Sequence, residues 1–228
     1  MNIQNPIDYI QIERALLGNI IIEELSTIER QIYEREKPAF DIGRMAERAA
    51  QGYYAHSAAI EVIKNPNSKN LLTNIQPNQP VPIETICRKD GSKHIFDSHY
   101  YLQYLRNPET MSDLTKIWLI GSLLTIGDAL SKHHYFDKNP QLELLYHLRN
   151  GVAHGNKFNI NKKGIERLAK YPAHNKNALV RVSGADFEIT PALNGKCVLF
   201  DFMGAGDVLD LLQSIGLHLM MLRNRLGR

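Results

Sequence analysis

Residues 117–130 have the sequence IWLIGSLLTIGDAL, which is the most apolar run of the chain. In a helix, apolar side chains of this run would occupy most sides, so the run predicts the central core helix of the fold. Ser112 or Asp113 is a good N-cap for that helix. The run is too short to span a bilayer and contains Asp128, so we expect no membrane segment.

Two helical patterns precede this run at the beginning of the chain. Apolar side chains recur near the helical period over residues 7–36, and Pro38 is expected to end that helix. Asp41 then suits the N-cap of a second helix that runs to about residue 63. The short connection predicts an antiparallel pair. Together with the core helix, the pair predicts a mainly α fold, an up-and-down helical bundle.

A polar insertion separates these helices from the core helix. Residues 65–82 are dominated by Asn, Pro, Ser and Gln and are expected to form a loop. Residues 84–88 and 93–96 flank Asp90-Gly91, which predicts a small β-hairpin. A short helical pattern follows the hairpin.

The C-terminal part begins with a basic segment, in which seven cations stand against one anion, Glu166. The cations are Lys157, Lys162, Lys163, Arg167, Lys170, Lys176 and Arg181. Alternating or apolar runs near residues 179–182, 187–190 and 197–202 then predict two or three short strands. Asp207 suits the cap of a last amphipathic helix that ends in arginines, whose charges favour a helix C-terminus.

These segments are expected to form a single domain, since 228 residues are ample for one hydrophobic core. The helical core covers about residues 7–63 and 112–158, the hairpin insertion about 65–97, the basic segment and short strands about 157–203, and the C-terminal helix about 207–225. The net charge of +3 permits a nucleic-acid partner without arguing for one. Cys87 and Cys197 form no C-x-x-C motif. The N-terminus lacks the features of a signal peptide, so we expect a cytoplasmic protein.

Chemistry concentrates in the stretch Leu148-Arg149-Asn150-Gly151-Val152-Ala153-His154-Gly155, at the end of a helix that Asn139 caps and Pro140 opens. On one unbroken helix, Arg149 and His154 would lie about 140° apart, because five residues turn by about 100° each. They could not both face one small ligand. Either Asn150-Gly151 ends the helix and turns the chain, or the two side chains meet across a dimer.

Arginine and histidine together suit phosphoryl chemistry that needs no metal. A guanidinium is always charged, matches a phosphate with a planar fork of donors and can stabilise a pentacoordinate transition state. An imidazole can take and return a proton at neutral pH. RNA supplies its own nucleophile, the 2′-hydroxyl. Two histidines, one from each subunit, would cover both proton transfers.

The sequence Arg149-Asn150-Gly151-Val152-Ala153-His154 resembles the Arg-x4-6-His signature of the HEPN superfamily (higher eukaryotes and prokaryotes nucleotide-binding domains), in which a polar residue typically follows the arginine. The resemblance implies a helical bundle that dimerises through the motif face. Many members are metal-independent endoribonucleases that leave a 2′,3′-cyclic phosphate and a 5′-hydroxyl, in toxin–antitoxin or phage-defence settings. It therefore implies that Arg149 and His154 are the catalytic pair and that Asn150 supports them. It also implies RNA and an antitoxin or defence protein as partners, and no metal or other cofactor.

The basic segment begins three residues after His154, where an RNA backbone would need cations, so Lys157, Lys162 and Lys163 are predicted to bind nucleic acid. The same lysines would also suit an ordinary solvated surface. Arg149 could instead interact with the carbonyl groups that end its helix, and His154 could be a core histidine. Some members of the superfamily keep the fold and only bind a nucleotide, RNA or a protein. A non-catalytic module is therefore the alternative function.

Overall fold

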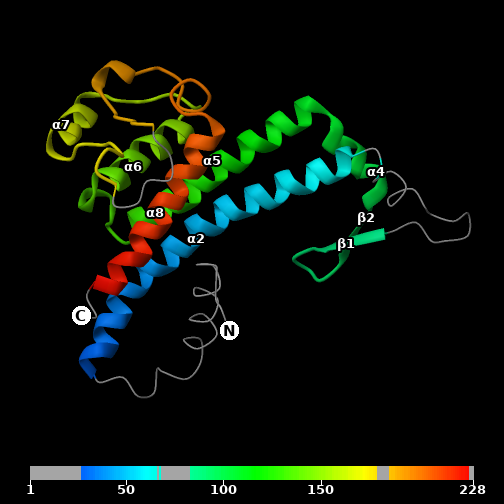
Figure 1. The fold of residues 1–228 in the computed structure, drawn as a ribbon, viewed down its shortest axis with the longest axis horizontal. Helices are drawn as coiled ribbons and strands as arrows, with labels where there is room; N and C mark the ends of the chain where they lie inside the picture. The colour runs from blue at the N-terminus through cyan, green and yellow to red at the C-terminus, as the bar shows by residue number, and fades with distance from the viewer. Residues whose placement is uncertain (1–26, 66, 68–82, 179–184, 226–228) are drawn as a thin grey trace, which may run out of the picture.

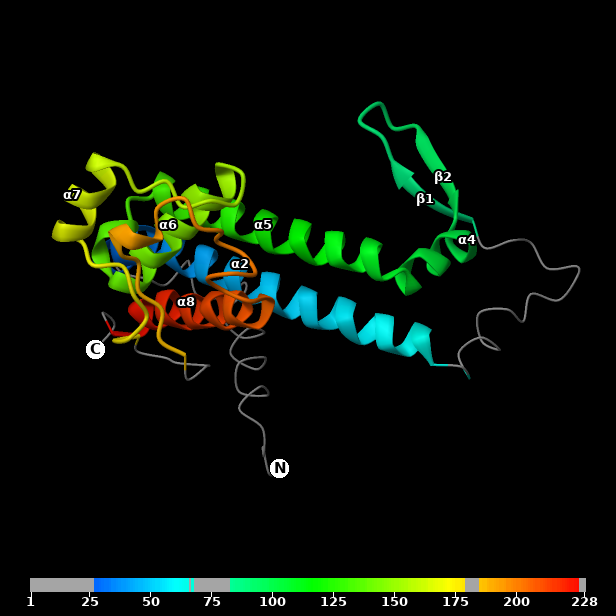
Figure 2. The ribbon, with the colours of Figure 1, turned by 90° about the horizontal axis from the view of Figure 1, so that it is seen from above.

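The computed structural model describes residues 27–65, 67, 83–178 and 185–225. These residues are mainly helical, as predicted, with one two-stranded sheet. In chain order the elements are α2 (Thr27–Lys64), β1 (Ile83–Cys87), β2 (Lys93–Asp97), α4 (Ser98–Leu102), α5 (Pro108–Lys132), α6 (Pro140–Ala153), α7 (Lys162–Lys170) and α8 (Ala205–Arg225), with short 3-10 helices at Gln103–Arg106, Phe136–Lys138 and Pro191–Leu193. Helices α2, α5 and α8 lie side by side, and α6 and α7 lie at one end of them (Figures 1 and 2).

Helix α2 continues through Pro38, where the sequence predicted a helix end. A proline inside a helix removes one backbone hydrogen bond and costs about 3 kcal/mol. Packing offsets this cost, because Ala39, Ile42 and Ala46 are buried in the core. The predicted antiparallel pair, residues 7–36 and 41–63, is therefore wrong over the described residues, because residues 27–36 and 41–63 belong to one helix. The part of its first helix that precedes residue 27 lies outside the described residues.

Helices α2 and α8 approach each other closely at a pair of glycines. A Cβ atom on Gly43 would lie 2.8 Å from the carbonyl oxygen of Gly216, and one on Gly216 would lie 2.9 Å from that of Gly43. Only glycine fits at such a separation, so the pair allows α8 to run along the first half of α2 (Figure 2). The end of α2 near Lys64 and the beginning of α5 near Pro108 extend beyond α8 as a two-helix arm (Figures 1 and 2).

Helix α5 begins at Pro108, before the predicted caps Ser112 and Asp113. The Asn107 side chain caps it by accepting hydrogen bonds from the backbone N–H groups of Glu109 and Thr110, at 2.8 and 3.2 Å. The second half of α5 is the core helix that the apolar run predicts. Within the described residues, α5 is the one helix that is long and apolar enough to cross a membrane, a criterion that core helices of soluble proteins also meet.

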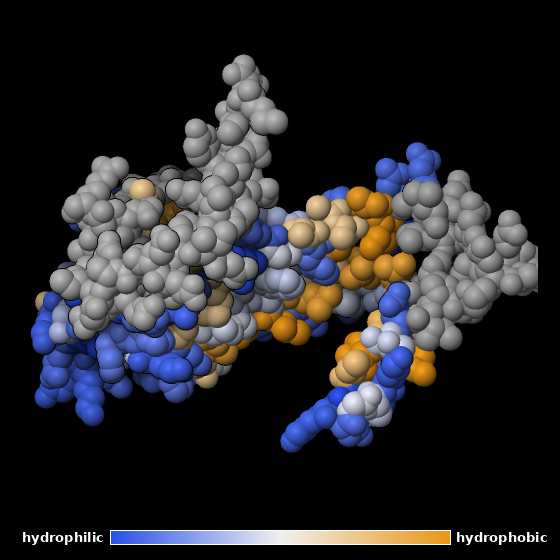
Figure 3. All heavy atoms as spheres, turned by 90° about the horizontal axis from the view of Figure 1, so that it is seen from below, coloured by the Kyte–Doolittle hydropathy of each residue, from blue (hydrophilic) through white to orange (hydrophobic). Residues whose placement is uncertain are grey.

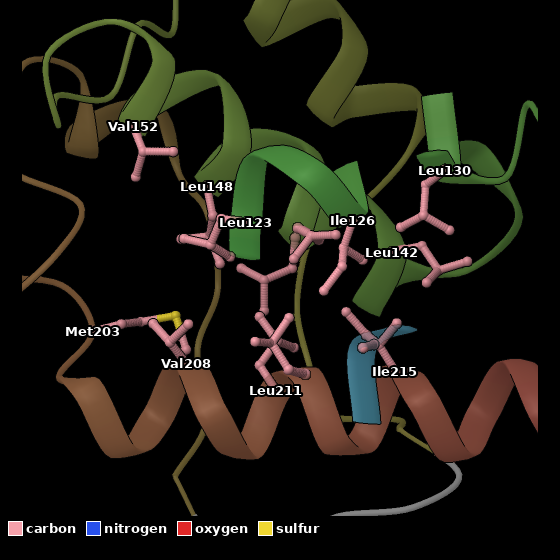
Figure 4. Close-up of a cluster of buried hydrophobic side chains, with 14 of the residues drawn as sticks. Leu123, Ile126, Leu130, Leu142, Leu148, Val152, Met203, Val208, Leu211 and Ile215 are labelled. Atoms are coloured by element: carbon pink, nitrogen blue, oxygen red, sulfur yellow. The ribbon is translucent and has the colours of Figure 1, made fainter. Parts of the chain in front are cut away.

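The hydrophobic core fills the space between α5, α6 and α8. Figure 4 shows side chains of these three helices facing one another, among them Leu123, Ile126 and Leu130 of α5, Leu142, Leu148 and Val152 of α6, and Val208, Leu211 and Ile215 of α8. The predicted start of α6 is confirmed, since the Asn139 side chain accepts a hydrogen bond from the backbone N–H of Gln141 at 2.9 Å. The core thus fixes the helix that carries the motif.

The predicted β-hairpin is confirmed. Strands β1 and β2 pair antiparallel, from Ile83 opposite Asp97 to Cys87 opposite Lys93. Gly91 has a φ of +81°, a conformation that favours glycine and closes the turn. The hairpin and α4 lie at the far end of the arm (Figures 1 and 2), and hydrophobic residues are exposed in this region (Figure 3).

The segment between α6 and α8 differs most from the prediction. Residues 162–170 form helix α7, which the Asn161 side chain caps, in a region expected only to be basic. Residues 187–190 and 197–202 form no strand and make only isolated bridges. The physical reason is that the Asn156 side chain, rather than a neighbouring strand, bonds the backbone of Leu199. The third predicted strand, residues 179–182, lies outside the described residues, and α8 confirms the predicted last helix.

Candidate functional site

Helix α6 is unbroken through Asn150-Gly151, so the first of the two arrangements expected for the motif is wrong. Gly151 lies against Val198, whose side chain would overlap a Cβ atom at this position. Its role is therefore close packing and not a turn. The chain turns only after the last helical residue, where Gly155 has a φ of +76° and Asn156 a φ of +64°. Such left-handed residues are typical of helix ends.

Arg149 is held by a carboxylate of the neighbouring helix α5. Its Nε and Nη2 atoms donate to Asp128 Oδ1 at 2.9 and 2.5 Å, and its Nη1 atom donates to Asn150 Oδ1 at 3.1 Å. Gly127 makes room for the arginine, because a Cβ atom there would lie 2.6 Å from Arg149 Cγ. The Arg149 side chain is 32% exposed. Its guanidinium is therefore oriented by the fold and still open to solvent.

His154 lies at the end of the same helix in different surroundings. It is the C-cap residue, and its backbone N–H donates to the carbonyl oxygens of Asn150 and Gly151, at 3.1 and 3.2 Å. Its side chain is exposed, so the core-histidine alternative is wrong. On an unbroken helix, Arg149 and His154 lie about 140° apart. Among the described residues, the Asn150 side chain bonds Arg149, whereas the ideal helical period aims His154 away from both.

The basic segment presents fewer available cations than its sequence suggests. Arg167 and Lys176 form ion pairs with carboxylates, and Arg181 lies outside the described residues. The exposed cations nearest the motif are Lys157, Lys162 and Lys163, the last two in the first turn of α7. Cations at a helix N-terminus add to the positive end of the helix dipole, which favours an anion there.

A second arginine–carboxylate pair, which the sequence pattern does not reveal, lies nearer the start of α6. Glu143 is 1% exposed, and Arg167 of α7 donates to both of its carboxylate oxygens, from Nη2 at 2.8 Å and from Nε. The guanidinium lies over the Tyr146 ring, 4.1 Å from its centroid. The pair therefore holds α7 against α6. The only local signal was the four-residue spacing of Glu143 and His147, which does not involve Arg167.

Burial shifts the pKa values of two groups at this pair. It raises the pKa of the Glu143 carboxyl, although Arg167 opposes the rise. Burial, together with the charge of Arg167, lowers the pKa of His147 to about 4. His147 is 5% exposed, with Nε2 3.7 Å from Glu143 Oε1. It is therefore neutral at pH 7, and these residues form a structural clamp away from solvent.

Within the described residues, no group of three or more His, Cys, Asp or Glu side chains is placed to hold a metal ion. A scan against models of known protein families finds no match for the chain. Searches of curated proteins and of solved structures find none either. The case for a functional site therefore rests on the residues of this chain.

Proposed function

We propose that the chain is a homodimeric, metal-independent endoribonuclease of HEPN type, in which Arg149 and His154 carry the reaction. The proposal rests mainly on the end of α6. There Asp128 fixes the guanidinium of Arg149, and the exposed imidazole of His154 follows little more than one helical turn later. An arginine has five N–H donors, and Asp128 and Asn150 use three of them. The other two are available to a phosphate.

In the proposed reaction, the 2′-hydroxyl oxygen of a ribose attacks the adjacent phosphorus, and the bond from phosphorus to the 5′-oxygen breaks. His154 takes the 2′-hydroxyl proton and returns it to the leaving 5′-oxygen. Arg149 stabilises the extra negative charge on the phosphate oxygens. Asn150, whose side-chain oxygen accepts a hydrogen bond from Arg149, helps to orient the guanidinium. The products carry a 2′,3′-cyclic phosphate and a 5′-hydroxyl.

A second copy of the chain is part of the proposal, because Arg149 and His154 face different directions on one helix. Arg149 of one protomer and His154 of its partner then act on the same phosphate. Support comes from α5, whose exposed face runs through Leu114, Ile117 and Thr125 to Asp128, the residue that holds Arg149. A two-fold contact along this face brings two motifs to one cleft.

Three lysines that follow His154 in the sequence contribute to RNA binding in this proposal. Their side chains are exposed, so their charges can pair with phosphates of the RNA backbone; they are Lys157, Lys162 and Lys163. The resemblance to HEPN proteins favours a cytoplasmic role in phage defence or toxin–antitoxin, with an antitoxin or defence protein as partner. The alternative is a non-catalytic HEPN module that binds nucleotide, RNA or a protein. This non-catalytic module is favoured if no second protomer is present, because Arg149 and His154 of one chain then cannot act on the same phosphate.

Cleavage in the presence of EDTA tests the proposal. Purified protein should cut single-stranded or structured RNA and leave 2′,3′-cyclic phosphate and 5′-hydroxyl ends. Arg149→Ala and His154→Ala should each abolish cleavage. His133→Ala, which removes another exposed histidine, should leave it unchanged. Cleavage that survives both motif substitutions would contradict the proposal, and saturable binding without cleavage would favour the non-catalytic module.

A further inference from the structure

An aromatic strip lies at the other end of the molecule from the motif, on the hairpin and the helical turns after it (Figure 1). Its rings form a continuous row, in which each ring neighbours the next. The centroid distances are 6.5 Å for His94–Phe96, 6.0 Å for Phe96–Tyr101, 5.1 Å for Tyr101–Tyr100 and 5.8 Å for Tyr100–Tyr104. His94 and Phe96 are two residues apart on β2, so they share one face of the hairpin. These five residues are the aromatic strip.

The strip is open to solvent and held in place. Tyr100, Tyr101 and Tyr104 are 52%, 53% and 41% exposed. The Asp97 side chain accepts a hydrogen bond from the Tyr100 backbone N–H at 3.0 Å, which fixes the first turn of α4. The hydroxyl groups of Tyr100 and Tyr104 hydrogen-bond to each other at 3.2 Å. Rings this exposed contribute little to a core, so folding alone does not explain their arrangement.

Cations lie at both ends of the strip. At the hairpin end, Arg88 Nη2 lies 3.4 Å from His94 Nδ1, so a guanidinium continues the row of rings. Lys89 and Lys93 are exposed at the hairpin turn, and Arg106, which also donates to the carbonyl oxygen of Ile63 at 3.1 Å, is exposed beyond the last tyrosine. The carboxylates of the hairpin are Glu84, Asp90 and Asp97. Exposed aromatic rings flanked by cations are typical of surfaces that bind single-stranded nucleic acids: the rings stack on the bases, and the cations pair with the phosphates.

We infer that the aromatic strip is a stacking platform for single-stranded RNA. Aromatic side chains accept unpaired bases of any sequence, since every base has a π-face, and the cations pair with the phosphates between them. The unbroken row of exposed rings favours an unpaired nucleic-acid strand as the ligand, because successive bases can stack on successive rings while their phosphates reach the cations at both ends. The choice of RNA over single-stranded DNA rests on the proposed function, whereas the stacking argument does not. The platform holds an unpaired strand at a distance from the motif.

Binding measured without cleavage tests the platform. The full chain with His154→Ala is titrated against a fluorescent oligouridine, and the dissociation constant is read from anisotropy. Tyr100→Leu and Tyr101→Leu should each raise the Kd about tenfold through lost stacking, and Tyr101→Phe should keep most of the affinity. Tyr54→Leu is the matched control, because this tyrosine is 43% exposed but lies on α2, outside the strip. It should leave the Kd unchanged, and circular dichroism should show every variant folded.

A Lys89→Glu variant supplies a second, independent readout. It should weaken binding at low salt and reduce the salt dependence of the Kd. An unchanged Kd in both leucine variants would overturn the platform. So would leucine variants that change the oligomeric mass in sedimentation but not the RNA affinity, because the strip would then be a protein contact. Cleavage is measured separately, with His154 intact. Tyrosine-dependent binding together with no cleavage by that chain would refute only the proposed function. Cleavage by that chain together with an unchanged Kd in the leucine variants would refute only the platform.

Discussion

Helix α6 carries two arginine–carboxylate pairs that differ in burial and geometry. Near its start, Glu143 is almost inaccessible to solvent, and Arg167 bonds both of its oxygens. Near its end, Arg149 bonds one oxygen of Asp128, a residue whose side chain is 59% exposed. A buried charge is costly once its partner is lost, whereas an exposed pair contributes little to stability. The first pair therefore fixes the fold, and the second leaves an oriented guanidinium available to a ligand.

Removing each arginine in turn should separate the two pairs most clearly. Arg167→Met leaves the Glu143 carboxyl buried without its partner, so we expect the free energy of unfolding to fall by about 3 kcal/mol. Arg149→Met should lower it by less than about 1 kcal/mol. Urea denaturation at pH 7 measures both. Adding Glu143→Leu to Arg167→Met should recover much of the loss, and equal losses in the two single variants would contradict the distinction.

The buried pair should also make the fold sensitive to acid through its neighbour His147. The pKa of His147 is about 4 in the fold, against 6.5 as its usual value, so the unfolded chain binds more protons between these pH values. The free energy of unfolding should therefore fall by about 2 kcal/mol from pH 7 to pH 5. The raised pKa of Glu143 acts in the opposite direction above pH 4.5.

His147→Phe removes the titrating group and should flatten this decline. Urea denaturation of both proteins at pH 7 and pH 5 gives the four values needed. A decline that is as steep in the variant as in the parent would show that another group titrates.

At the exposed pair, a small change that displaces Arg149 should reduce cleavage as well as stability. Gly127→Ala places a Cβ atom 2.6 Å from Arg149 Cγ and 2.9 Å from its Cβ, so the arginine must move. We expect cleavage to fall about tenfold, which is about 1.4 kcal/mol in the activation free energy. Gly206→Ala is the control, because a Cβ atom there meets open space and the residue lies on α8, away from the proposed dimer face of α5. Equal rates for the two variants would show that the position of Arg149 does not matter.

The smallest effect is expected for Asp128→Asn. The amide oxygen can still accept one hydrogen bond from Arg149, so cleavage should fall by less than about tenfold. The free energy of unfolding should change by less than about 1 kcal/mol, since the pair is exposed. Initial rates and urea denaturation measure the two quantities. A large loss of stability would place Asp128 with the structural pair and not with the site.

Features that depend on adjacent residues could be predicted from the sequence. Asn139-Pro140 marks the start of α6, and Asp90-Gly91 marks the hairpin turn, because a side-chain cap and a positive φ are local properties. The apolar run that ends at Leu130 predicted the core helix for a similar reason, since its composition leaves few polar sides.

Features that depend on distant segments could not be predicted. Pro38 stays inside α2 because that half of the helix is packed against α8, and no residue near Pro38 indicates this. Arg167 resembles the other cations of its segment, yet its partner Glu143 comes from another helix. The spacing of the motif left two alternatives. The structure excludes a break at Asn150-Gly151, because α6 continues and Gly151 packs against the distant Val198, whereas a contact across a dimer stays a prediction.

In the proposed dimer, Arg149 of one protomer and His154 of its partner act on one phosphate. Heterodimers purified with two different affinity tags test it. In the first, one protomer carries Arg149→Ala and the other His154→Ala. In the second, one protomer carries both substitutions and the other carries none.

We expect RNA cleavage by the first heterodimer, which keeps one complete combination of Arg149 and His154 across the interface. We expect none by the second, in which each combination across the interface lacks one member. Any cleavage by the second heterodimer, or none by the first, would contradict this arrangement.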